Sequence, residues 1–215
     1  MTYYVTHPRL ILFILTIMLT SHASTLKNCT SNSTPQKYIS LNCIKKFFDN
    51  FHTVQAGALY RSGQLSAQKL AKYIQKLGIK SIINLRGKNA DKRWWQEEQA
   101  CAKRFGVHFF NIAMSAQRLP YRQEIIQLLQ LYDHAPRPIL IHCQGGSDRT
   151  GEAAALWILD QQKKSKQEAL KHLSLKYLHI AYRKPYKKFF IETVWQDRSW
   201  LITAYNHNQY TLSKK

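Results

Sequence analysis

The chain has 215 residues, of which 45% are hydrophobic, with four cysteines, eight glycines and six prolines. This composition excludes a disordered tail, a collagen-like repeat and a disulfide-dense miniprotein. Its 32 Lys and Arg against 12 Asp and Glu give a formal net charge of +20, which attracts phosphate-bearing and other anionic partners without specifying which. The length suits one domain with a hydrophobic core.

An apolar run over residues 10–19 follows Arg9, and Ser21 and Ala23 have the spacing of a signal-peptidase site. We therefore expect a signal peptide over residues 1–23, cleaved after Ala23. The run is about half as long as the roughly 20 residues that a membrane-spanning helix needs. The protein is accordingly expected to be exported, either to the periplasm or out of the cell.

The mature chain is expected to comprise a flexible lead over residues 24–40 and a single domain over residues 41–215. We expect Cys29 to pair with Cys43 in an oxidising compartment, while Cys143 stands in a motif that indicates chemistry. Many late basic residues are interleaved with aromatic ones, which we interpret as the solvated faces of basic C-terminal helices. An anionic membrane surface is the alternative partner of these helices. No zinc-finger or ribonucleoprotein motif supports nucleic-acid binding.

Beyond residue 40 the hydrophobic pattern alternates between helical and extended periods. This predicts an α/β domain with a central, largely parallel sheet flanked by helices. Gly78 and Gly106 close two of the helices, and Ser165 with Glu168 forms a capping box. The predicted helices are 66–77, 94–105, 122–132, 153–159, 166–177 and 185–205, and the predicted strands are 81–85, 107–112 and 139–142.

The segment after the last predicted strand has the pattern of a phosphate-binding loop. It reads Cys143-Gln144-Gly145-Gly146-Ser147-Asp148-Arg149-Thr150-Gly151 and leads into an apolar helix. Glycines let the chain curl, so that N–H groups of the turn and of the helix N-terminus converge on an anion. We expect residues 144–149 to bind phosphate, with Arg149 as a bidentate clamp. The positive field favours the thiolate of Cys143, its nucleophilic form, and Thr150 can donate a hydrogen bond to that thiolate.

His142-Cys143, followed after five residues by Arg149-Thr150-Gly151, resembles the active-site motif of the cysteine-dependent tyrosine and dual-specificity phosphatases. Residues 59–65 (LYRSGQL) and 79–87 (IKSIINLRG) are similar to the front half of the bacterial, often exported, dual-specificity branch. The resemblance covers roughly residues 55–180. It implies a cysteine-phosphatase-like fold and a phosphocysteine on Cys143 that water hydrolyses. It also implies that no metal or other cofactor is needed.

The family commonly has an aspartate as general acid about thirty residues before the cysteine, but residues 113–120 contain no carboxylate. Three hypotheses address this difference. The acid can be Asp148, as proposed for myotubularin-like phosphatases, whose loop also ends Asp-Arg-Thr. It can be Glu124 or Asp133, swinging in from a predicted helix, or an aryl phosphate can react without a strong acid because a phenol leaves easily. We favour Asp148; the alternative is a structural carboxylate that pairs with a nearby arginine.

Four further side chains are given roles around this loop. Arg86 closes a strand expected to be parallel to that of Cys143, so it can contact substrate or hold the loop, or it can form an ordinary surface salt bridge. Arg61 is expected to be structural. Arg118 lies where the acid was expected, so it can bind a second phosphate or an acidic substrate. His142 is expected to be a structural hydrogen-bond partner of the loop.

These patterns predict an exported enzyme that hydrolyses phosphomonoesters, with a phosphotyrosine protein as the favoured substrate. A phosphoinositide or inositol phosphate is the alternative substrate, although Gln144 stands where several inositide-directed relatives have Lys. A second alternative is a catalytically silent phosphate-binding module.

Overall fold

The computed structural model describes residues 49–212. The predicted signal peptide, the flexible lead, Cys29 and Cys43 lie outside the described residues. Among residues 49–212, no helix combines the length and the apolar composition needed to cross a membrane.

The domain is built on a five-stranded sheet with the order β1-β2-β5-β3-β4. Its edge strand β1 runs antiparallel to β2, and the other neighbours are parallel, as the prediction of a largely parallel sheet requires. The sequence analysis did not predict β1 and β2, which are short and carry polar residues. The strands are β1 (His52–Gln55), β2 (Leu59–Ser62), β3 (Ser81–Asn84), β4 (His108–Asn111) and β5 (Ile139–His142).

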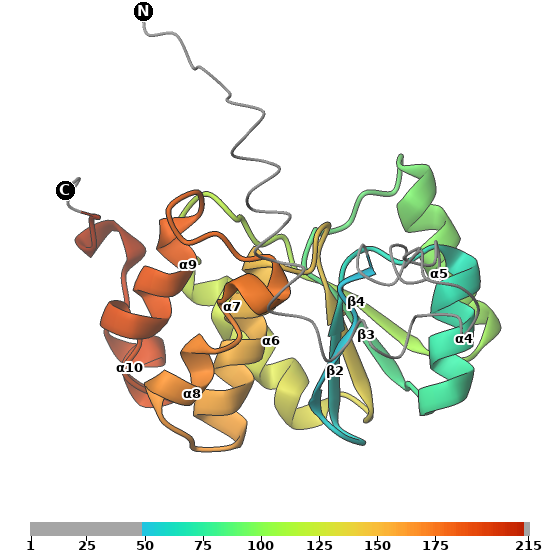
Figure 1. Ribbon diagram of the computed structural model, residues 1–215, viewed down its shortest axis with the longest axis horizontal. Helices are drawn as coiled ribbons and strands as arrows, with labels where there is room; N and C mark the ends of the chain where they lie inside the picture. Colours follow the sequence, from blue (N-terminus) through green and yellow to red (C-terminus); the bar gives the residue numbers. More distant parts are fainter. Residues whose placement is uncertain (1–48, 213–215) are drawn as a thin grey trace, which may run out of the picture. The chain divides into compact units, whose positions relative to one another are not determined.

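Helices cover both faces of the sheet (Figure 1): α4 and α5 lie on one side, and α6 to α10 on the other. Ser66 caps α4 by accepting the N–H of Lys69, and Gly78 ends it in the left-handed region with φ 64°. The helices are α4 (Ala67–Leu77), α5 (Arg93–Arg104), α6 (Arg122–His134), α7 (Asp148–Leu156), α8 (Lys166–Leu170), α9 (Pro185–Phe189) and α10 (Arg198–Thr203). Shorter helical turns are η2 (Trp157–Gln161), η3 (Leu175–Tyr177), η4 (Phe190–Val194) and η5 (His207–Gln209).

Successive strand residues face opposite sides of the sheet, which gives the domain two hydrophobic cores. Ile82 and Leu140 belong to the core under α4 and α5. Ile83, Ile139 and Ile141 belong to the larger core under the later helices. Because β3 and β5 are buried on both faces, the apolar residues in them are consecutive, as is usual in parallel sheets.

The predicted helix over 166–177 is wrong, because α8 ends at Leu170 and only the short turn η3 follows. The carbonyls of His172 and Tyr177 accept hydrogen bonds from the side chains of Arg61 and Asn50 instead of from a helical backbone. Long-range polar contacts therefore override the local helical pattern.

The single helix predicted over 185–205 is also wrong. The chain is extended at Trp195, whose side chain is buried in the core, and a new helix begins after Asp197. Asp197 caps that helix by accepting the N–H of Trp200 at 2.8 Å. The basic helices are not wholly solvated either, since Lys187 is fully buried and pairs with buried Glu152 at 2.9 Å.

Candidate active site

Cys143 follows directly on β5, which lies between the parallel strands β2 and β3. The carboxyl ends of parallel strands are where ligands of α/β folds bind. Residues 144–147 turn the chain, and α7 begins at Asp148, five residues before the predicted helix start at residue 153. The Cys143 loop (residues 143–149) therefore joins the centre of the sheet to a buried helix, and Cys143 itself is only 3% exposed.

Gly146 fixes the shape of the Cys143 loop. Its φ is +70°, and a Cβ there would lie 2.6 Å from the nitrogen of Gly63 and 2.7 Å from the carbonyl carbon of Ser62. The loop also accepts the N–H of Gln64 on the carbonyl of Gln144, at 3.0 Å. This close backbone packing explains why the Ser-Gly-Gln segment after β2 accompanies the loop.

Arg61, on β2, supports the Cys143 loop from inside the domain. Its guanidinium is fully buried and donates to the carbonyl of Gly146 at 2.7 Å and to that of His172 at 3.0 Å. The same group lies 4.0 Å from the centre of the Tyr177 ring. Burial lowers the pKa of Arg61 to about 10, which leaves the group charged at neutral pH. Arg61 is thus placed as a structural support of the loop.

Asn50 forms a second support that the sequence analysis did not identify. Its Nδ2 donates to the carbonyl of Gly145 and to the carbonyl of Tyr177, both at 2.9 Å. The loop and the segment around η3 are consequently fixed by the same side chain. Nothing in the local sequence marks Asn50, because its partners lie far along the chain.

His172 contacts Arg61 and Tyr177, and its protonation would disturb the support that they give to the Cys143 loop. Its Nδ1 lies 3.3 Å from Nη1 of Arg61, where a proton would face a donor, and its ring stacks on Tyr177. Burial, followed by the charges of Arg61, Lys176 and His52, lowers the pKa of His172 to about 4, against a weaker opposite effect of Glu168.

We expect acid to destabilise the protein through His172. The unfolded chain takes up this proton near pH 6.5 and the folded chain only near pH 4, so stability present above pH 6.5 is lost as the pH falls through that window. The loss is on the order of 2 kcal/mol. Urea unfolding at pH 7 and at pH 4.5 should show a smaller difference for His172→Gln than for the unmodified protein. His134→Gln, exposed on α6, is the control; an equal flattening there would contradict the assignment.

Arg149 lies in the first turn of α7, and its guanidinium has an N–H donor that is not hydrogen-bonded to any described residue. Its Nη1 is 3.3 Å from the carbonyl oxygen of Leu85, while its buried Nε has no hydrogen-bond partner within residues 49–212. Buried Thr150 likewise has an Oγ1 without a partner in the described part of the chain, so the expected hydrogen bond to Cys143 is not formed. The arginine is therefore available to grip phosphoryl oxygens.

Arg86 reaches the site through a chain of polar contacts. Its Nη1 donates to Oε1 of Gln64 at 2.9 Å, and Nε2 of Gln64 donates to Oε2 of Glu98 at 3.0 Å. The other oxygen of Glu98 lies 2.9 Å from Nε2 of His142, and both of those side chains are buried. Trp94 stacks against the guanidinium of Arg86, with its ring centre 3.5 Å away. His142 thus has a structural position, tied to Glu98 rather than open to substrate.

Arg86 interacts electrostatically with both Arg149 and Cys143. The pKa of Arg86 is lowered, first by burial and then by the like charge of Arg149, while Cys143 acts in the opposite direction. Because Coulomb interactions weaken with distance, Arg86 lies near both Arg149 and Cys143. An anion bound at the Cys143 loop would accordingly lie within the field of both arginines.

Asp148 has a partner that the sequence did not suggest. Instead of a nearby arginine, Oδ1 of Asp148 lies 2.7 Å from Nδ1 of His179, which follows η3 and is buried. The Asp148 side chain keeps 23% of its surface exposed. The carboxylate in the loop is therefore oriented yet accessible.

The other candidate acids are engaged elsewhere. Glu124 accepts two hydrogen bonds from Arg118, at 2.5 and 3.0 Å, and a third from the N–H of Tyr121, which closes the capping box of α6. Arg118 is thereby neutralised rather than free for a second phosphate. Asp133 pairs with Arg198 at the C-terminal end of α6. That end precedes β5, so it lies at the edge of the sheet opposite the Cys143 loop.

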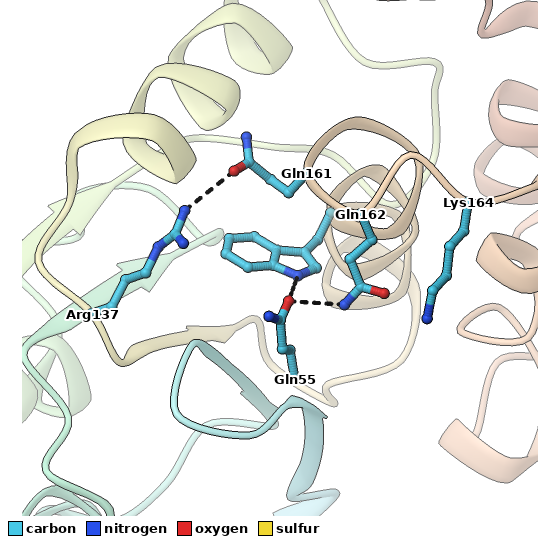
Figure 2. Close-up of a pocket in the computed structure, with 6 residues that line it drawn as sticks. Gln55, Arg137, Gln161, Gln162 and Lys164 are labelled. Carbon is cyan, nitrogen blue, oxygen red and sulfur yellow. Dashed lines mark hydrogen bonds between the residues drawn. The ribbon is translucent and has the colours of Figure 1, made fainter.

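A pocket of about 490 Å³ lies at this opposite edge (Figure 2). Gln55 accepts from the indole N–H of Trp157 and from Gln162, and Arg137 donates to Gln161. None of the predicted site residues contributes to it. Its lining residues are Gln55, Arg137, Trp157, Gln161, Gln162 and Lys164. Within residues 49–212, no group of three or more His, Cys, Asp or Glu side chains could hold a metal ion.

Solved structures share this architecture. The complex of TpbA from Pseudomonas aeruginosa with phosphotyrosine superposes with a TM-score of 0.55 at 24% identity, covering 67% of this chain and 84% of that one. The catalytic core of the PP-IP phosphatase Siw14 from Saccharomyces cerevisiae has a TM-score of 0.57 at 25% identity, covering 67% and 85%. These similarities confirm the predicted cysteine-phosphatase-like α/β fold.

Comparison of sequences gives the family. The dual specificity protein phosphatase TpbA of Pseudomonas aeruginosa is 30% identical over 117 residues, which are 54% of this chain and 49% of TpbA, so the chain spans about half the length of that curated relative. The family model described as "DSP-PTPase phosphatase fused to NAD+ Kinase" matches residues 37–184, which include the Cys143 loop and the five strands from β1 to β5. The chain therefore belongs to this DSP-PTPase family, among the dual-specificity cysteine phosphatases.

Proposed function

We propose that the protein is an exported enzyme that hydrolyses phosphomonoesters, with phosphotyrosine in proteins as its favoured substrate. The observation that carries the proposal is the position of Cys143 at the end of β5, in a loop that Arg61 and Asn50 support. The loop ends at Arg149, whose Nε has no hydrogen-bond partner among residues 49–212. Phosphotyrosine is supported by its presence in the TpbA complex. Export is supported by the apolar run and the cleavage pattern over residues 10–23.

The reaction follows from these positions in two steps. The thiolate of Cys143 attacks phosphorus, so that an S–P bond forms while the bond to the leaving oxygen breaks, and Arg149 with the loop N–H groups stabilises the charge on the phosphoryl oxygens. Asp148 gives its proton to the leaving oxygen. Water then attacks phosphorus and breaks the S–P bond, and Asp148 takes the proton from that water as phosphate and the thiolate are released.

Asp148→Asn tests the assignment of the acid. The amide keeps the shape of the side chain but cannot supply a proton, so kcat for an alkyl phosphate is expected to fall by about 100-fold. Release from an aryl phosphate with an activated phenol should fall much less. Phosphate release from both substrates measures the difference.

Asp133→Asn is the matched control, because it makes the same chemical change at the opposite edge of the sheet. It should leave the ratio of the two rates unchanged. Equal losses on both substrates in Asp148→Asn would show a structural carboxylate, and an alkyl-selective loss in Glu124→Gln would move the acid to α6.

A substrate with a second phosphate, such as an inositol phosphate, is the other candidate. The specific observation in its favour is that Arg86 interacts electrostatically with both Arg149 and Cys143, so that a second guanidinium lies near the Cys143 loop. The Siw14 core, which shares the fold, is named as a PP-IP phosphatase. The ratio of kcat/KM for a phosphotyrosine peptide to that for an inositol polyphosphate decides between the two substrates.

A further inference from the structure

His179 contacts the Cys143 loop from outside the catalytic motif. Its Nδ1 lies 2.7 Å from Oδ1 of Asp148, and its side chain has no exposed surface, whereas Asp148 is partly accessible. The two residues are 31 positions apart in the sequence. The contact therefore depends on how the segment after α8 is laid against the loop.

That segment is fixed by the same residues that shape the loop. Asn50 bonds the carbonyl of Tyr177 as well as that of Gly145, and Arg61 packs on the Tyr177 ring while bonding Gly146. Leu178 then adopts a left-handed conformation with φ 63°, which is uncommon for a side chain of this type. This turn places His179 against Asp148 and not in a continued helix.

The surroundings of His179 define which ring nitrogen carries the proton. Nε2 is buried and has no hydrogen-bond partner among residues 49–212. A proton on Nε2 would be a buried donor without an acceptor, which is costly, whereas a proton on Nδ1 is donated to Asp148. The neutral imidazole is therefore a donor at Nδ1, and it occupies Oδ1 of the carboxyl group.

We propose that His179 is a positioning residue that orients Asp148 for proton transfer. The inference rests on the proposed function, in which Asp148 is the general acid. With Oδ1 engaged by the imidazole, Oδ2 is the oxygen that carries the proton toward the leaving group. A histidine that orients a carboxyl group in this way acts through that group and does not touch the substrate.

The proton balance is the same in both steps. In the first step the Oδ2 proton passes to the leaving oxygen as its bond to phosphorus breaks, and the resulting carboxylate keeps the Nδ1–H bond of His179. In the second step water loses a proton to Oδ2 as its oxygen bonds to phosphorus and the Cys143 sulfur departs. The Nδ1–H hydrogen bond of His179 stabilises the carboxylate formed between the steps.

Replacement of His179 by leucine and by asparagine tests the proposal. His179→Leu removes the donor, and kcat for an alkyl phosphate is expected to fall by about tenfold, with KM within about twofold and little change for an activated aryl phosphate. Asparagine can present an N–H near the position of Nδ1, so His179→Asn should recover most of the loss. His134→Leu, on the exposed end of α6, is the control and should change neither rate.

A double variant separates positioning from general damage to the fold. If His179 acts through Asp148, adding His179→Leu to Asp148→Asn should lower alkyl turnover no further than Asp148→Asn alone. Equal losses on aryl and alkyl substrates, a failure of asparagine to rescue, or additive losses in the double variant would each overturn the proposal. If Asp148→Asn itself shows no preference for the alkyl substrate, the assigned acid is wrong; if it does while His179→Leu and His179→Asn match the unmodified protein, only the role of His179 fails.

Discussion

Cys143→Ser is expected to lower kcat for phosphate release by at least about 10⁴-fold, because a serine hydroxyl is not ionised at neutral pH and no other group can take its place as nucleophile. The Kd for substrate should stay within a few-fold of that of the unmodified protein, since the loop N–H groups, Gly146 and Arg149 are unchanged. Steady-state release from an aryl phosphate measures the first effect. Capture of a phosphotyrosine peptide by the inactive variant measures the second.

Cys101→Ser is the matched control for this experiment. Cys101 is also a free, buried cysteine, but it lies on α5 and belongs to the other core. Its replacement should leave turnover unchanged. Retained turnover in Cys143→Ser would contradict the phosphocysteine intermediate. An unmodified protein that binds phosphopeptide but releases no phosphate would instead be the catalytically silent module.

Arg149→Lys is expected to reduce kcat/KM by about 10³-fold, although the charge is conserved. The planar guanidinium can bond two phosphoryl oxygens at once, and its buried Nε has no hydrogen-bond partner within the described residues, whereas an ammonium is a point charge on a flexible stem. The loss should fall mainly on kcat, because the transferring phosphoryl group is held most strongly in the transition state. Steady-state kinetics on an aryl phosphate separates kcat from KM.

Arg137→Lys makes the same exchange at a residue that lines the pocket in Figure 2, on the other side of the domain from the Cys143 loop, and it should leave kcat and KM in this assay unchanged. A rise in KM at constant kcat in Arg149→Lys would assign Arg149 to ground-state binding alone. Activity equal to that of the unmodified protein would remove Arg149 from the phosphate site.

The layout of the Cys143 loop could be predicted because its parts are contiguous in the chain. A strand, a cysteine, a glycine-containing turn and an arginine at a helix start are set by backbone geometry over nine residues, 143–151. The positive φ of Gly146 is a local requirement of the same kind. Strands β3 and β5 were predictable for a similar reason, since burial on both faces favours apolar runs, whereas β2 was missed because it contains Arg61 and Ser62.

Arg61 was expected to be structural, but the contacts through which Arg61 and Asn50 support the site could not be predicted from local patterns. Arg61 bonds a carbonyl 85 positions away and Asn50 one 95 positions away, so no periodicity records either contact. Both are polar residues that become buried, and polar residues usually indicate surface. The late helices were wrongly extended because their interruptions depend on these distant donors and on the cap at Asp197.

The sequence by itself determined the fold class and the family, and it indicated the nucleophile and the phosphate clamp that we propose, because these depend on short segments whose backbone geometry follows from their own residues. Only the tertiary structure decided which partner holds Asp148, that Glu124 and Asp133 are engaged in other ion pairs, and that Lys187 is buried. Those outcomes depend on which distant groups meet when two faces of a sheet are covered. Burial then forces each polar group to find whatever partner the packing brings within reach.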